Sequence, residues 1–326
     1  MNDQPHSAAP PLISSHEFAT VADLIKRMTG IHISSNKRAM VSGRLAKRLK
    51  ALGISSVDAY CDWLQRPGNA AEQDAFISAL TTNMTRFNRE DHHFTHLTDH
   101  ILPGLAAAAR SGRRVRLWSA ACSTGEEAYD LAFRVLDACP EAARLDIRIL
   151  ATDIDKTALG TARAGVYPAA SLSDLPHGFA DCHLERGKGA GNMVRVADAP
   201  RDLVTFRCLN LNGDWPFNGA FDVIMCRNVT IYFDEDTQAR LWRRLADRIT
   251  PGGALYVGHS ELLPEAIAIR FTQQERGAFC LPPDAPPKAA SITRHDTAVT
   301  PAPPHTELTN LTPADAHRPD NNGGLG

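Results

Sequence analysis

The chain has 326 residues, a formal net charge of −2 and a hydrophobic fraction of 43%. This length suits one large or two modest domains with tails, and the small net charge argues against a nucleic-acid partner. No apolar run is long enough to span a membrane, and the polar start of the chain lacks the apolar core of a signal peptide. We therefore expect a cytoplasmic protein without membrane insertion.

The cysteines are scattered, odd in number and free of the paired spacing that zinc sites show. We expect buried free thiols in a reducing compartment, and no metal. The seven are Cys61, Cys122, Cys139, Cys182, Cys208, Cys226 and Cys280.

The first part of the chain has helical periodicity. Residues 1–15 are a flexible lead, after which apolar residues recur at helical spacing. The predicted helices cover about 18–28 with a stop at Gly30, 40–52 with a stop at Gly53, 56–64 behind a cap at Ser56, and 70–80. We predict an N-terminal all-α domain over 16–95 and a linker helix over 96–112.

From residue 113 to 282 short apolar runs alternate with helical segments, which is typical of a parallel α/β sheet. The predicted strands are 115–121, 147–152, 221–226 and 254–258, and the predicted helices are 126–138, 156–164 and 236–249. Pro251, Gly252 and Gly253 are expected to form a turn into the last strand.

Two segments depart from the α/β pattern. Residues 165–209 are glycine-rich and charged, and we expect an inserted subdomain with short antiparallel strands at 193–196 and 203–206. Residues 283–326 contain mostly proline, alanine, threonine and aspartate. They bury too little apolar surface to order themselves, so we expect a disordered tail.

The first strand and its turn, residues 115–130, carry the most informative pattern. Small residues follow the strand, and Glu126 and Glu127 then begin a helix. A bare helix N-terminus suits a phosphate, whereas two acids repel one, and the G-x-G-x-x-G motif of dinucleotide sites is missing. The pattern favours a cationic nucleoside such as S-adenosylmethionine. Alternatively, the two acids only complement the helix dipole.

Polar residues also end the next two strands of the predicted sheet. Asp153 could accept both ribose hydroxyls of a nucleoside, or it could cap a helix. Arg227 and Asn228 follow the strand 221–226 and need partners if they are buried. Those partners could be a ligand or a structural salt bridge.

Residues 81–90, Thr-Thr-Asn-Met-Thr-Arg-Phe-Asn-Arg-Glu, close the helical domain and show no apolar face. We interpret this linker segment either as a polar connection between domains or as a lid over a cofactor.

Taken together, these segments resemble the chemotaxis receptor glutamate methyltransferases, the CheR family. The resemblance spans about 18–282 and is carried by Trp-Ser-Ala-Ala-Cys-Ser-Thr-Gly-Glu-Glu at 118–127, Ala-Thr-Asp-Ile-Asp at 151–155, Cys-Arg-Asn-Val-Thr-Ile-Tyr-Phe at 226–233 and Gly-His-Ser-Glu at 258–261. It implies a helical domain for receptor docking and cofactor cover. It also implies that a Rossmann-like class I methyltransferase domain with a small antiparallel β-subdomain follows.

The resemblance also implies which residues contact the cofactor. Arg89 would hold the methionyl carboxylate, Glu127 would lie near the cationic methionine portion, and Asp153 would hold the ribose. Asn210 and Leu211 would flank the adenine. The full implied set is Asn83, Thr85, Arg89, Glu127, Asp153, Asn210, Leu211, Arg227 and Asn228.

The chain departs from the family pattern at four places. Ala128 stands where the family usually has proline, and Asp130 stands where it has serine. Asn88 replaces the second of two aromatic residues, and Thr230 replaces an aliphatic one. None of these departures removes a matched cofactor contact.

Methyl transfer to a glutamate needs no general base, because the carboxylate is already ionised at neutral pH. Catalysis then comes from alignment and the removal of water. Tyr232 is expected either to orient the substrate carboxylate or to pack beneath the site.

The expected partner is the cytoplasmic helical domain of a chemoreceptor. Arg44, Lys47 and Arg48 lie on a basic helix that could dock onto an acidic receptor bundle or could be an ordinary solvated face. In some family members the β-subdomain also binds a C-terminal receptor peptide by strand addition. The alternatives are a non-catalytic module that binds S-adenosylmethionine, and methylation of a small molecule or a nucleic acid.

Overall fold

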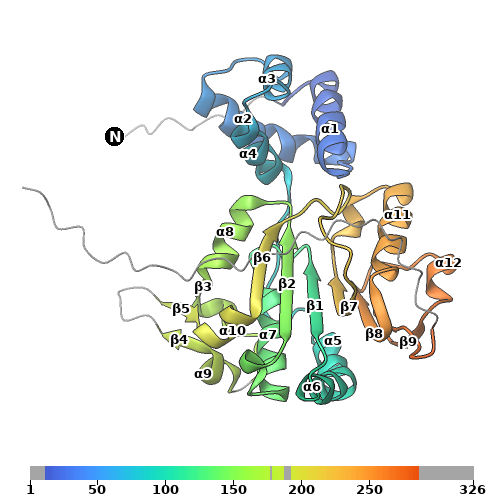
Figure 1. Ribbon diagram of the computed structural model, residues 1–326. Helices are drawn as coiled ribbons and strands as arrows, with labels where there is room; N and C mark the ends of the chain where they lie inside the picture. The colour runs from blue at the N-terminus through green and yellow to red at the C-terminus, as the bar shows by residue number, and fades with distance from the viewer. Residues whose placement is uncertain (1–11, 177, 187–191, 286–326) are drawn as a thin grey trace, which may run out of the picture. The chain divides into compact units, whose positions relative to one another are not determined.

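The computed structural model describes residues 12–176, 178–186 and 192–285 (Figure 1). Most of the predicted lead and the predicted tail lie outside these residues, as does the glycine-rich loop 187–191. The N-terminal helices are α1 Ser15–Thr29, α2 Arg38–Leu52, α3 Val57–Leu64 and α4 Ala70–Leu80.

Local sequence explains where α1 begins and ends. The Ser14 hydroxyl accepts from the backbone N–H of Glu17, and the Glu17 carboxylate accepts from the backbone N–H of Ser14. This capping box satisfies two N–H groups that a helix start leaves unpaired. Gly30 ends the helix at φ +84°, a conformation that glycine adopts without steric cost. The buried faces of α1–α4 form a hydrophobic core of their own.

The second part contains a seven-stranded sheet in the order β6-β2-β1-β7-β8-β10-β9. β6, β2, β1, β7 and β8 run parallel, and β10 and β9 complete the sheet in antiparallel pairings. The strands are β1 Val115–Ala120, β2 Ile147–Asp153, β6 Val204–Cys208, β7 Phe221–Cys226, β8 Ile249–Val257, β9 Thr272–Glu275 and β10 Ala278–Cys280.

Helices cover both faces of this sheet, and successive residues of β1 enter different cores. Leu117 lies in the core with α6 and α7, while Trp118 lies in the core with α11. The helices of this part are α5 Asp91–His96, continued by a π-helical turn Leu97–Ile101, then α6 Leu102–Arg110, α7 Glu126–Ala138, α8 Lys156–Ala164, α10 Asp198–Leu203, α11 Glu235–Ala246 and α12 Glu265–Ala268. The expected Rossmann-like fold behind an all-α domain is confirmed.

A separate three-stranded antiparallel sheet has the order β3-β5-β4, with β3 Val166–Pro168, β4 Leu184–Arg186 and β5 Met193–Val196. The helix α9 Phe179–His183 precedes β4. The predicted strand at 193–196 therefore lies in the small sheet.

The prediction that 203–206 form an antiparallel strand of the inserted subdomain is wrong. These residues belong mostly to β6, which pairs in parallel with β2 at the edge of the large sheet. Val204 and Phe206, two residues apart on β6, are both buried in the core of the large sheet.

Two smaller predictions near β8 are also corrected. The helix expected over 236–249 ends at Ala246, and β8 begins at Ile249. The expected turn at residues 251–253 lies within β8, opposite a shift in its register with β7. Gly253 fits there because a Cβ would come within 2.8 Å of the Asp222 carbonyl oxygen.

Side-chain and backbone contacts join the helical part to the α/β part. Ile31 forms an isolated antiparallel bridge with Phe233, and Asn210 Nδ2 donates to the Met28 carbonyl at 3.0 Å. Thr81 Oγ1 donates to an Asp155 oxygen at 3.0 Å. Within the described residues, no helix combines the length and apolarity needed to cross a membrane.

Candidate active site

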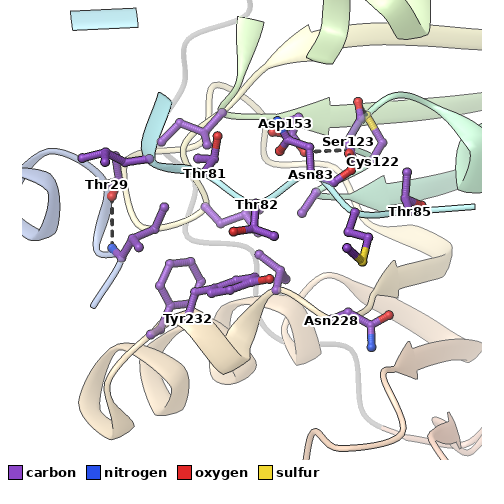
Figure 2. Close-up of a pocket in the computed structure, with 18 of the residues that line it drawn as sticks. Thr29, Thr81, Thr82, Asn83, Thr85, Cys122, Ser123, Asp153, Asn228 and Tyr232 are labelled. Carbon is purple, nitrogen blue, oxygen red and sulfur yellow. Dashed lines mark hydrogen bonds between the residues drawn. The ribbon is translucent and has the colours of Figure 1, made fainter. Parts of the chain in front are cut away.

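A pocket of about 1110 Å³, counting the open space at its mouth, lies at the carboxyl ends of β6, β2, β1 and β7. The β1–β7 boundary is where the strand order reverses, and open α/β sheets bind their ligands at that point. Figure 2 shows Asp153, Ser123 and Asn83 gathered on one side, with Tyr232 and Asn228 across from them.

The structure brings every implied cofactor contact to this pocket, together with Tyr232. The residues that line it include Asn83, Thr85, Arg89, Glu127, Asp153, Asn210, Leu211, Arg227, Asn228 and Tyr232. Arg44, Lys47 and Arg48 do not line it.

The backbone of the turn after β1 adopts left-handed conformations at two residues other than glycine. Ala121 and Ser123 both have positive φ, 71° and 51°, although neither is glycine. Gly125 has φ +99°, and a Cβ there would come within 2.8 Å of Ala162. Such strained residues concentrate at functional sites, where the surrounding fold holds them. The strain here brings the backbone of residues 121–123 to the pocket wall.

Glu127, in the first turn of α7, is almost fully buried and has two strong partners. Ser119 Oγ donates to Glu127 Oε1 at 2.6 Å, and Arg227 Nε donates to Glu127 Oε2 at 2.9 Å. A buried carboxylate needs such partners to stay charged. Glu127 therefore does more than complement the helix dipole, because it forms one half of a buried ion pair at the pocket.

Arg227 is the other half of that pair, and its side chain is only 2% exposed. Its Nη2 donates to the Arg89 carbonyl at 2.7 Å, and its guanidinium lies 5.2 Å from the centre of the Phe94 ring. The sequence left open a ligand contact or a structural salt bridge. The structure contains the salt bridge, at a place where the side chain also lines the pocket.

Asp153 ends β2, and its carboxylate is held by backbone N–H groups. Ser123 N–H donates to one oxygen at 2.7 Å, and Asp155 N–H donates to the other at 2.9 Å. Burial raises the pKa of Asp153, and these two hydrogen bonds oppose the rise. The carboxylate is thus fixed toward the pocket beside the strained β1 turn.

Asp155 is a buried residue to which the sequence analysis gave no role. It accepts from Thr157 N–H at the start of α8, and also from Thr81 Oγ1 and from Asn83 Nδ2 at 2.5 Å. This acid therefore holds the linker segment 81–90 against the sheet. Asp155 is the second aspartate of the Ala-Thr-Asp-Ile-Asp motif, so the sequence did contain a signal for its importance.

Glu261 organises the turn after β7. Its buried carboxylate accepts from the backbone N–H groups of Gly258, Asn228, Val229 and Thr230, at distances between 2.7 and 2.9 Å. Asn228 adopts φ +57° within this turn. The glutamate of the Gly-His-Ser-Glu motif thus fixes the backbone of residues 228–230, two of which line the pocket. The motif's sequence alone did not reveal this role.

The linker segment is less polar in its contacts than its composition suggests. Phe87 is fully buried and packs edge-on against Tyr167, with ring centres 5.0 Å apart. The expectation that this segment has no apolar face to bury needs correction, because Phe87 anchors it in the core of the large sheet. The same segment places Asn83, Thr85 and Arg89 at the pocket.

Two of the three basic residues expected to dock a receptor have partners inside the protein. Arg48 pairs with Glu72, and Arg44 donates to the carbonyl oxygens of Ala79 and Thr81. Lys47 is exposed. Only part of this basic face is therefore free for a partner.

The cysteines agree only in part with the expectation of buried thiols. Cys182 and Cys208 are exposed and Cys280 is half-buried, whereas the other four are buried. All seven are free thiols. Among the described residues, no group of three or more His, Cys, Asp or Glu side chains is placed to hold a metal ion.

The pocket suits a cationic nucleoside better than a phosphorylated one. Glu127 and Asp153 line it, and the positive charge of Arg227 is already matched by Glu127. A di- or triphosphate would meet these two acids, and among the lining residues only Lys37 and Arg89 would remain to offset them. S-adenosylmethionine carries an ammonium and a sulfonium, which fit this charge distribution.

Comparison with known proteins agrees with this chemistry. The chain matches the CheR methyltransferase all-alpha domain over residues 16–81 and the CheR methyltransferase SAM binding domain over residues 83–278. It is 46% identical to a probable chemotaxis protein methyltransferase of Rhizobium etli over 71% of this chain and 87% of that protein.

Two further relatives carry the name chemotaxis protein methyltransferase. The Klebsiella aerogenes protein is 42% identical over 77% of this chain and 84% of its own length. The Escherichia coli protein is 38% identical over 83% of this chain and 93% of its own length. The resemblance drawn from the four sequence motifs is confirmed, and the chain belongs to the CheR family of S-adenosylmethionine-binding methyltransferases.

Proposed function

We propose that this protein transfers a methyl group from S-adenosylmethionine to glutamate side chains of chemoreceptors and forms methyl esters. The observation that carries the proposal is the convergence of Glu127, Asp153, Arg89 and Tyr232 on one pocket between the helical and α/β parts. The relatives' names describe methyltransferases, which favours a catalyst over a module that only binds the cofactor.

In this proposal each wall of the pocket holds one part of the cofactor. Asp153, fixed by the Ser123 and Asp155 N–H groups, would accept the ribose hydroxyls. Glu127 would face the cationic methionine portion, and Arg89 would hold its carboxylate. Asn210 and Leu211 would flank the adenine, with Asn83, Thr85, Arg227 and Asn228 completing the set.

The bound cofactor would supply an electrophilic methyl group, and the protein's residues would align the acceptor and exclude water. The substrate carboxylate is ionised at neutral pH, so no residue has to remove a proton. Tyr232, which lines the pocket, would orient that carboxylate. Its backbone is fixed by His32 N–H, which donates to the Tyr232 carbonyl at 2.7 Å.

The substrate surface would be the cytoplasmic helical domain of a receptor, so the protein would act in the cytoplasm. Lys47, and Arg44 and Arg48 where they remain accessible, would face its acidic side chains. The small sheet has two edge strands, β3 and β4, either of which could accept a receptor C-terminal peptide by strand addition.

The test is transfer of a labelled methyl group from S-adenosylmethionine to a cognate receptor fragment. We expect label on the receptor that is released as methanol in base, and loss of transfer in Asp153→Ala. A matched control is Asp222→Ala, a buried aspartate at the opposite end of β7 that accepts from Arg116 N–H.

Other outcomes would point elsewhere. Base-stable label would contradict the ester. Cofactor binding without transfer to any receptor would favour the binding module, and transfer to RNA or a small molecule in preference to receptor would favour the remaining alternative.

A further inference from the structure

Arg89 lies between two residues in a conformation that side-chain-bearing residues rarely adopt. Asn88 has φ +53° and Glu90 has φ +57°. A single left-handed residue is unfavourable, and two that flank one residue persist only where neighbouring groups hold them. The place of Arg89 at the pocket therefore depends on whatever fixes this turn.

Two sets of holding contacts come from residues that follow β7 and β8. Arg227 Nη2 donates to the Arg89 carbonyl at 2.7 Å. The Glu90 carboxylate accepts from His259 Nδ1 at 2.9 Å and from Asn228 Nδ2 at 3.2 Å. These contacts fix the carbonyl of Arg89 and the residue after it.

The third contact comes from Asp130 on α7, one helical turn after Glu127. Asp130 Oδ2 accepts from the backbone N–H of Asn88 at 2.7 Å. Arg134, one turn further along α7, donates to Asn88 Oδ1 at 3.0 Å. α7 thus holds both the backbone and the side chain of the residue before Arg89.

Asp130 is an unfavourable residue to use as a mere structural anchor. Its side chain is buried, its Oδ1 has no hydrogen-bond partner, and no cation lies within ion-pair distance of it among the described residues. Burial raises its pKa to about 8, although the Asn88 N–H opposes the rise.

We propose that Asp130 is a positioning residue, which acts through the Asn88 N–H to hold Arg89 at the pocket in the geometry that binds the methyl donor. This inference rests on the proposed function, because it assumes that Arg89 holds the donor. In this proposal, Asp130 and Glu127 have different roles on α7. Glu127 lines the pocket, and Asp130 holds the linker segment that covers it.

The experiment measures binding of S-adenosylhomocysteine by calorimetry and donor kinetics on a receptor fragment. Asp130→Ala removes the acceptor, and we expect the Kd to rise about tenfold, with the donor KM rising more than kcat falls. Asp130→Asn keeps an oxygen for the Asn88 N–H, so its Kd should lie within about twofold of wild type. Asp222→Ala removes a comparable backbone acceptor far from the pocket, and it should lower thermal stability with Kd unchanged within about twofold.

A second pair of variants tests the same idea if Asp130→Ala fails to fold. Asn88→Ala and Asn88→Gly both lose the amide contacts, but only glycine adopts φ +53° without cost. We expect the alanine variant to bind S-adenosylhomocysteine several-fold more weakly than the glycine variant. Equal affinities for these two, or wild-type affinity in Asp130→Ala, would overturn the inference.

These outcomes are separate from those that test the proposed function. If wild-type protein fails to bind S-adenosylhomocysteine, the proposed function fails. If wild type binds and Asp222→Ala weakens binding as much as Asp130→Ala, only the positioning role of Asp130 is contradicted.

Discussion

Glu127 and Asp130 are acids on the same helix, three residues apart, and the fold treats them differently. Glu127 is paired with Arg227 at 2.9 Å and accepts a hydrogen bond from Ser119. Asp130 is buried, accepts one backbone N–H and leaves one oxygen without a partner. The first is half of a buried ion pair that lines the pocket, whereas burial favours the neutral form of the second.

The two acids share one helix, so the difference between them comes from the partners that other segments of the chain supply. Removal of one partner from a buried ion pair is costly, because it leaves the other charge buried and uncompensated. Substitution of Arg227, Asp130 or Glu127 tests this difference, and substitution of the exposed Lys47 gives a surface charge for comparison.

The largest effect is expected from Arg227→Met, which makes Glu127 as unpartnered as Asp130. The free energy of unfolding should fall by about 3–5 kcal/mol, the usual cost of leaving one member of a buried pair alone. Urea denaturation measures it. The double variant Glu127→Gln/Arg227→Met should recover part of the loss, and equal stability of the single variant and wild type would contradict the pairing.

Asp130→Asn should make the protein more stable, increasingly so at higher pH. The folded pKa of Asp130, about 8, lies above the ordinary aspartate value of 3.8, so folding takes up a proton between about pH 4 and pH 8. Wild-type stability therefore falls as pH rises through that window, by up to about 1.4 kcal/mol per unit, and levels off above it.

The measurement is the difference in unfolding free energy between Asp130→Asn and wild type, taken at several pH values. The charged groups that face Asp130 are Arg134, Arg227 and Glu127, and both proteins contain all three. A difference that does not grow between pH 4 and pH 8 would show that Asp130 is ionised in the folded protein.

Glu127→Gln removes the charge that would face the cationic cofactor. We expect S-adenosylmethionine to bind about tenfold more weakly, a loss of about 1.4 kcal/mol. S-adenosylhomocysteine lacks the sulfonium charge and should lose less. Calorimetry with both ligands tests this, and an equal loss for the two would place Glu127 away from the sulfonium.

The smallest effect is expected from Lys47→Ala. Lys47 is exposed, and a single surface charge contributes about 0–1 kcal/mol. The KM for the receptor fragment should rise by up to about fivefold at low salt and approach the wild-type value at high salt. A KM that does not depend on salt would remove Lys47 from the receptor-binding surface.

Much of the local structure could be predicted because its signals are local. The caps at Ser14 and Gly30 lie next to the apolar periodicity that they bound, and the four main parallel strands are buried apolar runs. The strand β6 was assigned to the wrong sheet, because a five-residue run does not encode which strand it pairs with.

The same limit applies to the site. Asp153 and Glu127 could be proposed because each follows a strand or begins a helix in a recognisable motif. Asp155, Glu261 and Asp130 accept hydrogen bonds from backbone N–H and side-chain groups up to 74 residues away in the chain. No local sequence pattern specifies those partners.

The sequence by itself determined the family, most of the order of the elements and ten of the residues that line the pocket, because motifs and periodicity are local features of the chain. The tertiary structure alone decided that Arg227 neutralises Glu127, that Asp130 has no such partner, and that Asn88 and Glu90 hold Arg89 in a strained turn. Those properties depend on burial and on distances between segments far apart in the chain, and both exist only once the sheet has formed.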